Sequence, residues 1–201
     1  SSLSIEQELY WEMQIIQAIK KDKFEIFAQS INSKNKKKYE ILIRMKDSKD
    51  EIVSPYFFIN RAKKINLYNE ITKKVIQKSF EFFENKKVEL KMLHFFINAG
   101  IRDTAYYWNE LLKCMKVYIA LKKECPSLDS LNIGGGFPIK NSLAFEYDYQ
   151  YMVDEILNQI KIACDDAEVP VPHIFTEFGS FTVGEAGGAL YQVLYQKKQN
   201  D

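Results

Sequence analysis

The first 90 residues of this 201-residue chain contain no glycine, no histidine and no cysteine. Average usage would place about six glycines in a stretch of that length. All 8 glycines, both histidines and all 3 cysteines lie in residues 91–201. Charge is uneven too, because residues 1–90 carry 18 Lys and Arg against 13 Asp and Glu, whereas residues 91–201 carry 10 against 14. This uneven composition can arise by chance or from two ordinary domains. A more specific explanation is that two sequences of different origin are joined near residues 86–92.

Other absences narrow the class of protein. No uninterrupted apolar run approaches the roughly 20 residues that a membrane-spanning helix needs. Residues 1–10 are mixed polar and lack the basic and apolar segments of a secretion signal. A net charge of +1 gives no general attraction to nucleic acid. We therefore expect a cytoplasmic protein that takes a small-molecule ligand and has neither a membrane nor a nucleic-acid polymer as its partner.

The three cysteines are Cys114, Cys125 and Cys164, an odd number without a C-x-x-C pair. This spacing is not typical of a metal site. We interpret them as reduced thiols that mostly serve packing. A nucleophilic cysteine is the alternative, although no cysteine has a histidine beside it in the sequence.

The first half of the chain is predicted to run helix, strand, strand, helix, helix. Apolar residues recur at helical spacing over residues 5–20. The recurring residues are Leu9, Met13, Ile16 and Ile19, with Trp11 and Ile15 alongside them. Apolar and polar residues alternate over residues 24–31 and 39–45, which indicates two strands around a basic, solvated, hairpin-like loop. One helix is predicted to begin at Ser54-Pro55, and another covers residues 67–85.

The second of these strands has two faces of different chemistry. Tyr39, Ile41, Ile43 and Met45 form an apolar face that we expect to meet the core. Glu40, Leu42 and Arg44 alternate with them and so lie on the opposite face. A carboxylate suits a divalent cation such as Mg²⁺, and a guanidinium suits phosphate.

This stretch resembles the N-terminal third of EAL domains, the bacterial phosphodiesterases that open cyclic di-GMP. The matching pieces are FEIFAQSI, YEILIRM and IVSPYFFINRAKK, with Glu40-Ile41-Leu42 in place of the E-A-L signature. The resemblance implies that Glu40 is a ligand of Mg or Mn, and that Gln29, Leu42 and Arg44 contact the dinucleotide. It stops near residue 86, and the later metal ligands of the family have no counterpart here. An ordinary strand carboxylate is the alternative role for Glu40.

The second half alternates strands and helices. Strands are predicted over residues 88–98, 130–133 and 173–176, and helices over 104–123 and 149–163. The predicted stripe of the first of these helices consists of Tyr107, Leu111, Met115, Tyr118 and Leu121. The order of these elements implies right-handed parallel βαβ units, and α/β barrels place their chemistry at the carboxyl ends of such strands. Two of these ends carry candidate binding residues, Gly134, Gly135, Gly136 and Glu177. Consecutive glycines can cradle a phosphate with their N–H groups, and a carboxylate can meet a cationic ring nitrogen of a phosphate-bearing cofactor.

Residues 91–201 resemble the fold III pyridoxal-phosphate decarboxylases, especially the biosynthetic arginine decarboxylases. The segments LHFFINAGIRD, LNIGGGF and HIFTEFGSFTVGEAG carry this resemblance. It implies that Gly134, Gly135 and Gly136 hold the phosphate of pyridoxal phosphate, that Glu177 pairs with the pyridinium nitrogen, and that Gly179 lines the phosphate site.

The sequence also departs from that family. Phe96 stands where the family has a ring-stacking histidine, and Ser180 where it has an arginine that contacts the phosphate. The segments that supply the Schiff-base lysine and the decarboxylating cysteine have no counterpart. We expect His94 to be a buried, hydrogen-bonded histidine and His173 to be structural.

Both resemblances are to α/β barrels. We therefore predict an α/β fold of parallel, TIM-barrel-like architecture, partial or chimeric, with an EAL-like piece at residues 1–87 and a decarboxylase-like piece at 88–201. Three functions stay open: a pyridoxal phosphate-binding decarboxylase module that is not catalytic alone, an EAL-type phosphodiesterase or receptor, and a non-catalytic α/β scaffold. Whether the chain is an enzyme is open too, and so is a homo-oligomer, since fold III enzymes are usually dimers.

Overall fold

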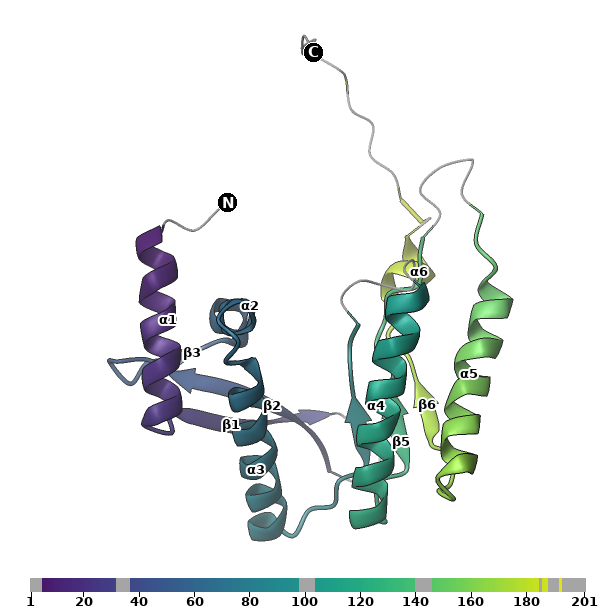
Figure 1. Cartoon of the computed structure of the whole chain (residues 1–201), viewed down its shortest axis with the longest axis horizontal. Helices are drawn as coiled ribbons and strands as arrows, with labels where there is room; N and C mark the ends of the chain where they lie inside the picture. The colour runs from purple at the N-terminus through teal and green to yellow at the C-terminus, as the bar shows by residue number, and fades with distance from the viewer. Residues whose placement is uncertain are drawn as a thin grey trace. The chain divides into compact units, whose positions relative to one another are not determined.

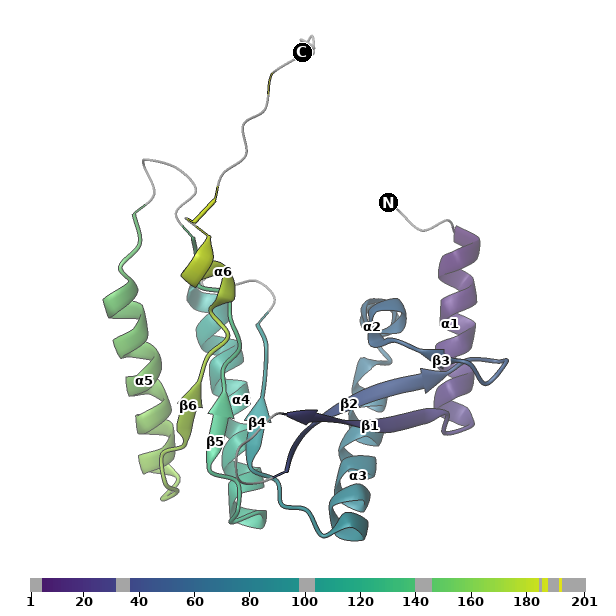
Figure 2. The same cartoon turned by 180° about the vertical axis from the view of Figure 1, so that it is seen from behind.

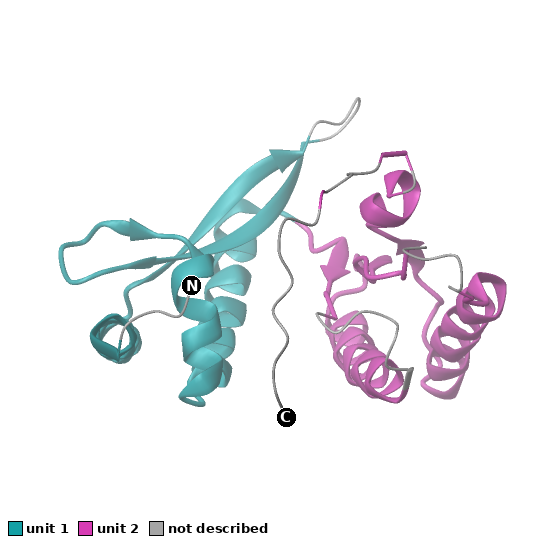
Figure 3. Ribbon diagram, turned by 90° about the horizontal axis from the view of Figure 1, so that it is seen from above, with its two compact units in different colours: residues 1–88 teal, residues 89–201 magenta. Residues whose placement is uncertain are grey.

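The chain forms two compact units, Ser1–Val88 and Glu89–Asp201, which Figure 3 distinguishes by colour. The structure is a computed structural model. It describes residues 5–31, 37–97, 104–139, 146–184, 186, 187 and 192. Each unit has a hydrophobic core of its own.

Unit 1 is an antiparallel sheet with helices on one face. Its elements are α1 (Ile5–Lys20), β1 (Phe24–Ile31), β2 (Lys38–Lys46), β3 (Ile52–Val53), α2 (Pro55–Lys64) and α3 (Tyr68–Lys86). The strand order is β1-β2-β3, and both neighbouring pairs are antiparallel. Figures 1 and 2 show the three helices on the same side of this sheet. The predicted parallel architecture does not extend to this unit, because a short β1–β2 connection permits only antiparallel pairing.

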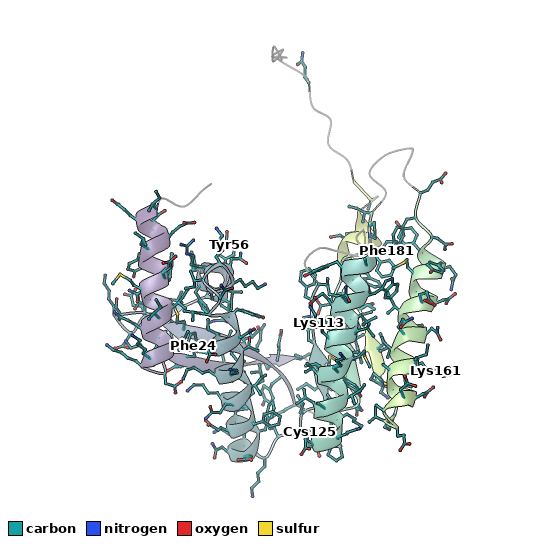
Figure 4. The ribbon with its side chains drawn as sticks, in the orientation of Figure 1. Phe24, Tyr56, Lys113, Cys125, Lys161 and Phe181 are labelled. Carbon is teal, nitrogen blue, oxygen red and sulfur yellow. The ribbon has the colours of Figure 1, made fainter. Side chains whose placement is uncertain are left out.

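The core of unit 1 lies between the sheet and the helices. It consists of Ile15, Ala18, Phe24, Met45, Val53, Phe58, Ala62 and Ile71. The predicted inner face of β2 is confirmed at Met45, which is fully buried, and at Ile43, which packs against the cluster. Phe24, labelled in Figure 4, pairs with Met45 across the strands and contacts the Phe58 ring at 6.0 Å. Tyr39, at the far end of the same face, is 43% exposed.

The predicted helix over residues 5–20 is confirmed, and its buried residues are Gln14, Ile15 and Ala18. Of the apolar residues that indicate this helix, Ile15 is buried, whereas Leu9, Met13 and Ile16 are exposed. Gln14 can occupy the inner face because its Nε2 donates to Ser48 Oγ at 3.2 Å and its Oε1 accepts from the Ser48 N–H at 2.7 Å. Apolar residues lie on two sides of α1, and only one of these sides is buried. The buried side is the one on which Gln14 bonds to Ser48.

Unit 2 is a parallel sheet covered by two helices. Its elements are β4 (Met92–His94), α4 (Thr104–Glu124), β5 (Ser130–Asn132), α5 (Tyr149–Asp166), β6 (His173–Phe175) and α6 (Gly179–Val183). The strand order is β4-β5-β6 and both pairs are parallel, which confirms the predicted βαβ arrangement. In Figure 3, α4 and α5 lie on the same side of the sheet. The chain is thus a mixed α/β protein, and its described residues form two three-stranded sheets rather than a closed barrel.

The first strand of unit 2 is shorter and more exposed than predicted. The sequence predicts a buried strand over residues 88–98, but β4 spans Met92–His94, with half-buried Leu93 between two exposed neighbours. Leu93 packs toward the helices, as do Leu131 and Ile174 on the other two strands. Since α4 and α5 cover one face, alternate strand residues point away from the core. The prediction that His94 is buried is therefore wrong, because its side chain is 40% exposed.

Helix α4 supplies much of the core of unit 2. Its predicted stripe is confirmed, since Tyr107, Leu111, Met115 and Tyr118 are all buried. The interpretation of the cysteines as packing residues is confirmed for Cys114 and Cys164, which are free thiols in the core. Burial raises the pKa of the Cys114 thiol to about 12 and that of the Tyr118 phenol to about 12.

These two groups predict a loss of stability at high pH. In the unfolded chain Cys114 and Tyr118 ionise near their ordinary pKa values of 9.0 and 10.0, whereas the folded state holds both neutral. Their contribution to the free energy of unfolding is complete below pH 9 and is lost as the pH rises from 9 toward 12. We expect a decrease of at least about 2 kcal/mol between pH 8 and pH 11, since one pKa unit corresponds to about 1.4 kcal/mol.

Guanidinium unfolding of a Trp11→Phe variant measures this change, because Trp108 in unit 2 is then the only tryptophan. The matched control carries Cys114→Ala and Tyr118→Phe as well, and its stability should depend less on pH over this range. An equal pH dependence in both proteins would show that these buried groups are not responsible.

Candidate functional site

The carboxyl ends of β4, β5 and β6 meet at one edge of unit 2 because the strands are parallel. The register aligns His94, Asn132 and Phe175, which are the last residues of the three strands. The three glycines 134–136 follow β5, and Glu177 follows β6. The structure thus brings the glycine run and the carboxylate of the decarboxylase-type prediction to neighbouring strand ends.

The Asn132 side chain joins the two loops that leave this edge. Its Nδ2 donates to Glu177 Oε1 at 2.8 Å, and its Oδ1 accepts from the Gly134 N–H at 2.8 Å. The Gly134 carbonyl in turn accepts from the Glu177 N–H at 2.8 Å. These three bonds close a ring that fixes the Glu177 carboxylate relative to the glycine turn. A side-chain amide suits this position because it donates and accepts at once.

The glycine turn approaches its neighbours more closely than a side chain would allow. Gly134 has φ +69°, and a Cβ there would lie 2.8 Å from the Phe95 carbonyl oxygen. A Cβ on Gly135 would lie 2.5 Å from the Glu177 carbonyl oxygen. Gly136 has φ 108°, which only glycine adopts readily. Glycine is therefore required at position 135 by close contact, at position 136 by its backbone conformation, and at position 134 by both.

The three N–H groups of the glycine turn differ in their hydrogen bonding. The Gly134 N–H is bonded to the Asn132 side chain. Among the described residues, none accepts a hydrogen bond from the N–H of Gly135 or Gly136. Successive N–H groups in a turn of this kind form a concavity that attracts anions.

An aromatic cluster holds the loops on both sides of the edge. The Phe137 ring, next to the glycine turn, lies 4.2 Å from the Phe178 ring and 6.0 Å from that of Phe181, which Figure 4 labels. The Tyr149 hydroxyl donates to the Pro138 carbonyl at 2.7 Å. Phe137 is buried, so this packing restrains the segment after the turn and the segment after Glu177 together.

Three further side chains or positions lie at or near this edge. His94 Nε2 is 3.7 Å from Glu177 Oε1, too far for a hydrogen bond but close enough for an ion pair when the imidazole is protonated. Phe96 is 59% exposed, and a Cβ on Gly134 would lie 3.1 Å from its Cδ2 atom, so its ring flanks the turn. Gly179 begins α6, and a Cβ there would meet nothing within 4 Å. Glycine is therefore not required for space at position 179.

The EAL-type residues of unit 1 share one face of the β1–β2 pair. Gln29 is opposite Glu40, and Arg44 is opposite Glu25. Leu42 lies between them in the same alternation. Arg44 Nη1 donates to the Ile43 carbonyl at 2.7 Å, and its guanidinium lies over the Phe27 ring at 5.7 Å. In the described part of the chain, no three His, Cys, Asp or Glu side chains gather as a metal site, so Glu40 belongs to no such group there.

Sequence reasoning missed Asn132, which organises the strand-end site. In the sequence, Asn132 stands out only as a polar residue near the end of a predicted strand that is followed by three glycines. Its alternation with buried Leu131 predicts that it points away from the helices, and its place at a strand end predicts proximity to Glu177. The two hydrogen bonds themselves depend on backbone positions that periodicity does not give.

The chain matches the family model of the pyridoxal-dependent decarboxylases, pyridoxal binding domain, over residues 12–184. It therefore belongs to the pyridoxal-dependent decarboxylase family, as a pyridoxal-binding domain. The biosynthetic arginine decarboxylase of Citrifermentans bemidjiense is 30% identical over 117 residues, which cover 55% of this chain and 18% of that protein. That of Pseudomonas putida is 25% identical over 119 residues, 56% of this chain and 19% of that protein. The chain thus matches about a fifth of the length of these curated relatives.

Both resemblances found in the sequence recur among solved structures. The biosynthetic arginine decarboxylase of Campylobacter jejuni aligns over 54% of this chain and 20% of its own length, with 24% identity and a TM-score of 0.47. The EAL domain of FimX from Xanthomonas citri, solved with cyclic di-GMP, aligns over 85% of this chain and 83% of its own, with 16% identity and a TM-score of 0.50. The second likeness is one of fold alone. None of the helices in the described residues is long and apolar enough to cross a membrane.

The closeness of Gly135 to Glu177 predicts the effect of a single methyl group. We expect Gly135→Ala to lower the free energy of unfolding of unit 2 by about 1–3 kcal/mol, because the new Cβ must displace backbone. Gly179→Ala is the matched control, since its Cβ meets nothing within 4 Å. Guanidinium unfolding followed by Trp108 fluorescence compares the two. Equal stability of the two variants would contradict the close approach of the strand ends.

Proposed function

We propose that this chain holds the pyridoxal phosphate of an arginine-type amino-acid decarboxylase at the carboxyl edge of β4, β5 and β6. The observation that carries the proposal is the hydrogen-bonded ring through Asn132, which places a carboxylate beside a glycine turn. Membership of the decarboxylase family supports the cofactor. The biosynthetic arginine decarboxylases among the relatives support the substrate class.

The residues at this edge fit both ends of the cofactor. The N–H groups of Gly135 and Gly136 would bind the phosphate, because no described residue accepts a hydrogen bond from either of them. Glu177 would pair with the pyridinium nitrogen, and the exposed ring of Phe96 would stack on the pyridine. When bound, pyridoxal phosphate supplies an electron sink that stabilises negative charge on the carbon that loses carboxylate.

The side chains around Glu177 orient it for this pairing. Asn132 acts as a positioning residue, because its Nδ2 holds one carboxylate oxygen while its Oδ1 anchors the turn. Glu177 is about half exposed, with a side-chain exposure of 54%, so the carboxylate stays accessible to a ligand.

A ligand without an aldehyde tests the binding site directly. Pyridoxine 5′-phosphate forms no imine with surface lysines, so its calorimetric titration reports only the non-covalent contacts. We expect Asn132→Ala and Glu177→Gln each to weaken its binding by roughly tenfold, about 1.4 kcal/mol. Glu124→Gln, at the end of α4, is the control and should bind like the unchanged chain. No measurable binding by the unchanged chain, or equal binding by all four proteins, would overturn the proposal.

Unit 1 supports a second candidate function, binding of cyclic di-GMP. The supporting observation is that Gln29, Glu40, Leu42 and Arg44 share one strand face. Arg44 would contact a phosphate, and Glu40 would coordinate Mg or Mn. Calorimetry with cyclic di-GMP and Mg²⁺ tests it, and absence of heat argues against it. A cooperative melt without binding of either ligand would instead favour a non-catalytic α/β scaffold.

We expect this chain alone to catalyse neither reaction. The segments for the Schiff-base lysine and the decarboxylating cysteine have no counterpart in the sequence, and among the described residues Glu40 belongs to no group of three potential metal ligands. The measurements are release of labelled CO₂ from arginine and opening of cyclic di-GMP. Glu177→Ala and Glu40→Ala are the respective controls. Turnover above either control would show that the chain contains a complete active site.

A further inference from the structure

Helix α1 carries apolar residues on two opposite sides. Its inner side meets the core of unit 1 through Ile15 and Ala18. Its outer side carries Ile5, Leu9, Met13 and Ile16, which are 77%, 53%, 60% and 39% exposed. We call these four residues the outer stripe.

The outer stripe is one continuous surface. Its members are separated by four, four and three residues, the spacing that places side chains next to one another along one side of a helix. A helix that is apolar on both sides is normally buried on both. The stripe therefore needs a second covering surface, and the charges at its two ends indicate which one.

An acidic and a basic residue stand at opposite ends of this side of α1. Glu6 lies in the first turn, and Lys20 is the last residue of the helix. Both are exposed, and the ion pairs between described residues use neither of them. Glu8 and Glu12, by contrast, are already paired with Arg61 inside unit 1.

Two copies of α1 match each other when they run antiparallel. Met13 then meets Met13 of the second copy near the centre, and Leu9 faces Ile16. Glu6 of each copy faces Lys20 of the other, and each helix dipole lies beside an oppositely directed one. A parallel pair would instead oppose Glu6 to Glu6 and Lys20 to Lys20. The antiparallel pair has two-fold symmetry and uses the same surface of both copies.

We propose that the outer stripe of α1 is the interface of a homodimer, in which two α1 helices pack antiparallel. This interface lies in unit 1 and is independent of the proposed cofactor site in unit 2. A single pair of 16-residue helices forms a small contact, so the dimer is weak and depends on concentration.

Sedimentation velocity of the full chain tests the interface. From about 1 to 100 μM, the chain should pass from monomer to dimer. Met13→Glu should weaken association at least tenfold, because two charges would then meet at the centre of the interface. Ile76→Glu is the matched control, since Ile76 is an exposed residue of α3 with similar exposure, 48%. Circular dichroism checks that both variants fold.

A charge reversal distinguishes self-pairing from other occupants of the stripe. Glu6→Lys and Lys20→Glu alone should each weaken the dimer about fivefold, since each replaces two attractive pairs by two repulsive ones. The double variant restores both pairs in reversed sign and should recover dimerisation. A monomer at all concentrations, a dimer unaffected by Met13→Glu, or a double variant without recovery would overturn the proposal; the first result would assign the stripe to a different partner.

Discussion

The candidate site depends on one side chain that connects two strand ends. Asn132 bonds the Glu177 carboxylate with its amide nitrogen and the Gly134 N–H with its amide oxygen. Parallel strands bring residues from distant parts of the sequence to one edge, but they leave the loops beyond that edge free to diverge. The Asn132 amide removes this freedom, and the buried ring of Phe137 packs against the same two loops. The carboxylate and the anion-attracting turn therefore form one arrangement.

That arrangement explains three of the eight glycines in the second half of this chain. At this edge a β-carbon at position 135 would meet the Glu177 backbone, and positions 134 and 136 adopt conformations that side chains resist. Unit 1 also has left-handed backbone positions, but they are occupied by Asp22, Asp50, Asn66 and Lys87 rather than by glycine. The family match nevertheless covers residues of both units, from 12 to 184. A difference in composition between the halves is thus compatible with one family assignment, and the separate origin of the two pieces remains a proposal.

Sequence patterns predicted the buried residues correctly where they indicate one buried side of an element. The α4 stripe is an example, because Tyr107, Leu111, Met115 and Tyr118 recur at helical spacing and are all buried, whereas Tyr106, Leu112 and Val117 of the same helix are exposed. The pattern predicted helix α1 but not its buried side, because apolar residues lie on two sides and the Gln14–Ser48 contact is made on the buried one. It also failed on β4, whose apolar run suggested burial on both faces. At the site, the order of the predicted strands was enough to bring the glycines and Glu177 to the same edge of the sheet. The role of Asn132 could not be predicted in this way, because it depends on hydrogen bonds between loops.

A double-mutant cycle between Asn132 and Glu177 tests the central claim most directly. The free energies of unfolding of the unchanged chain, Asn132→Ala, Glu177→Ala and the double variant give the coupling energy of the two side chains. Because Glu177 is half exposed, the bond between them should yield a coupling of about 0.5–1 kcal/mol. Additive effects, within about 0.3 kcal/mol, would contradict the account, because the two strand ends would then be held by other contacts.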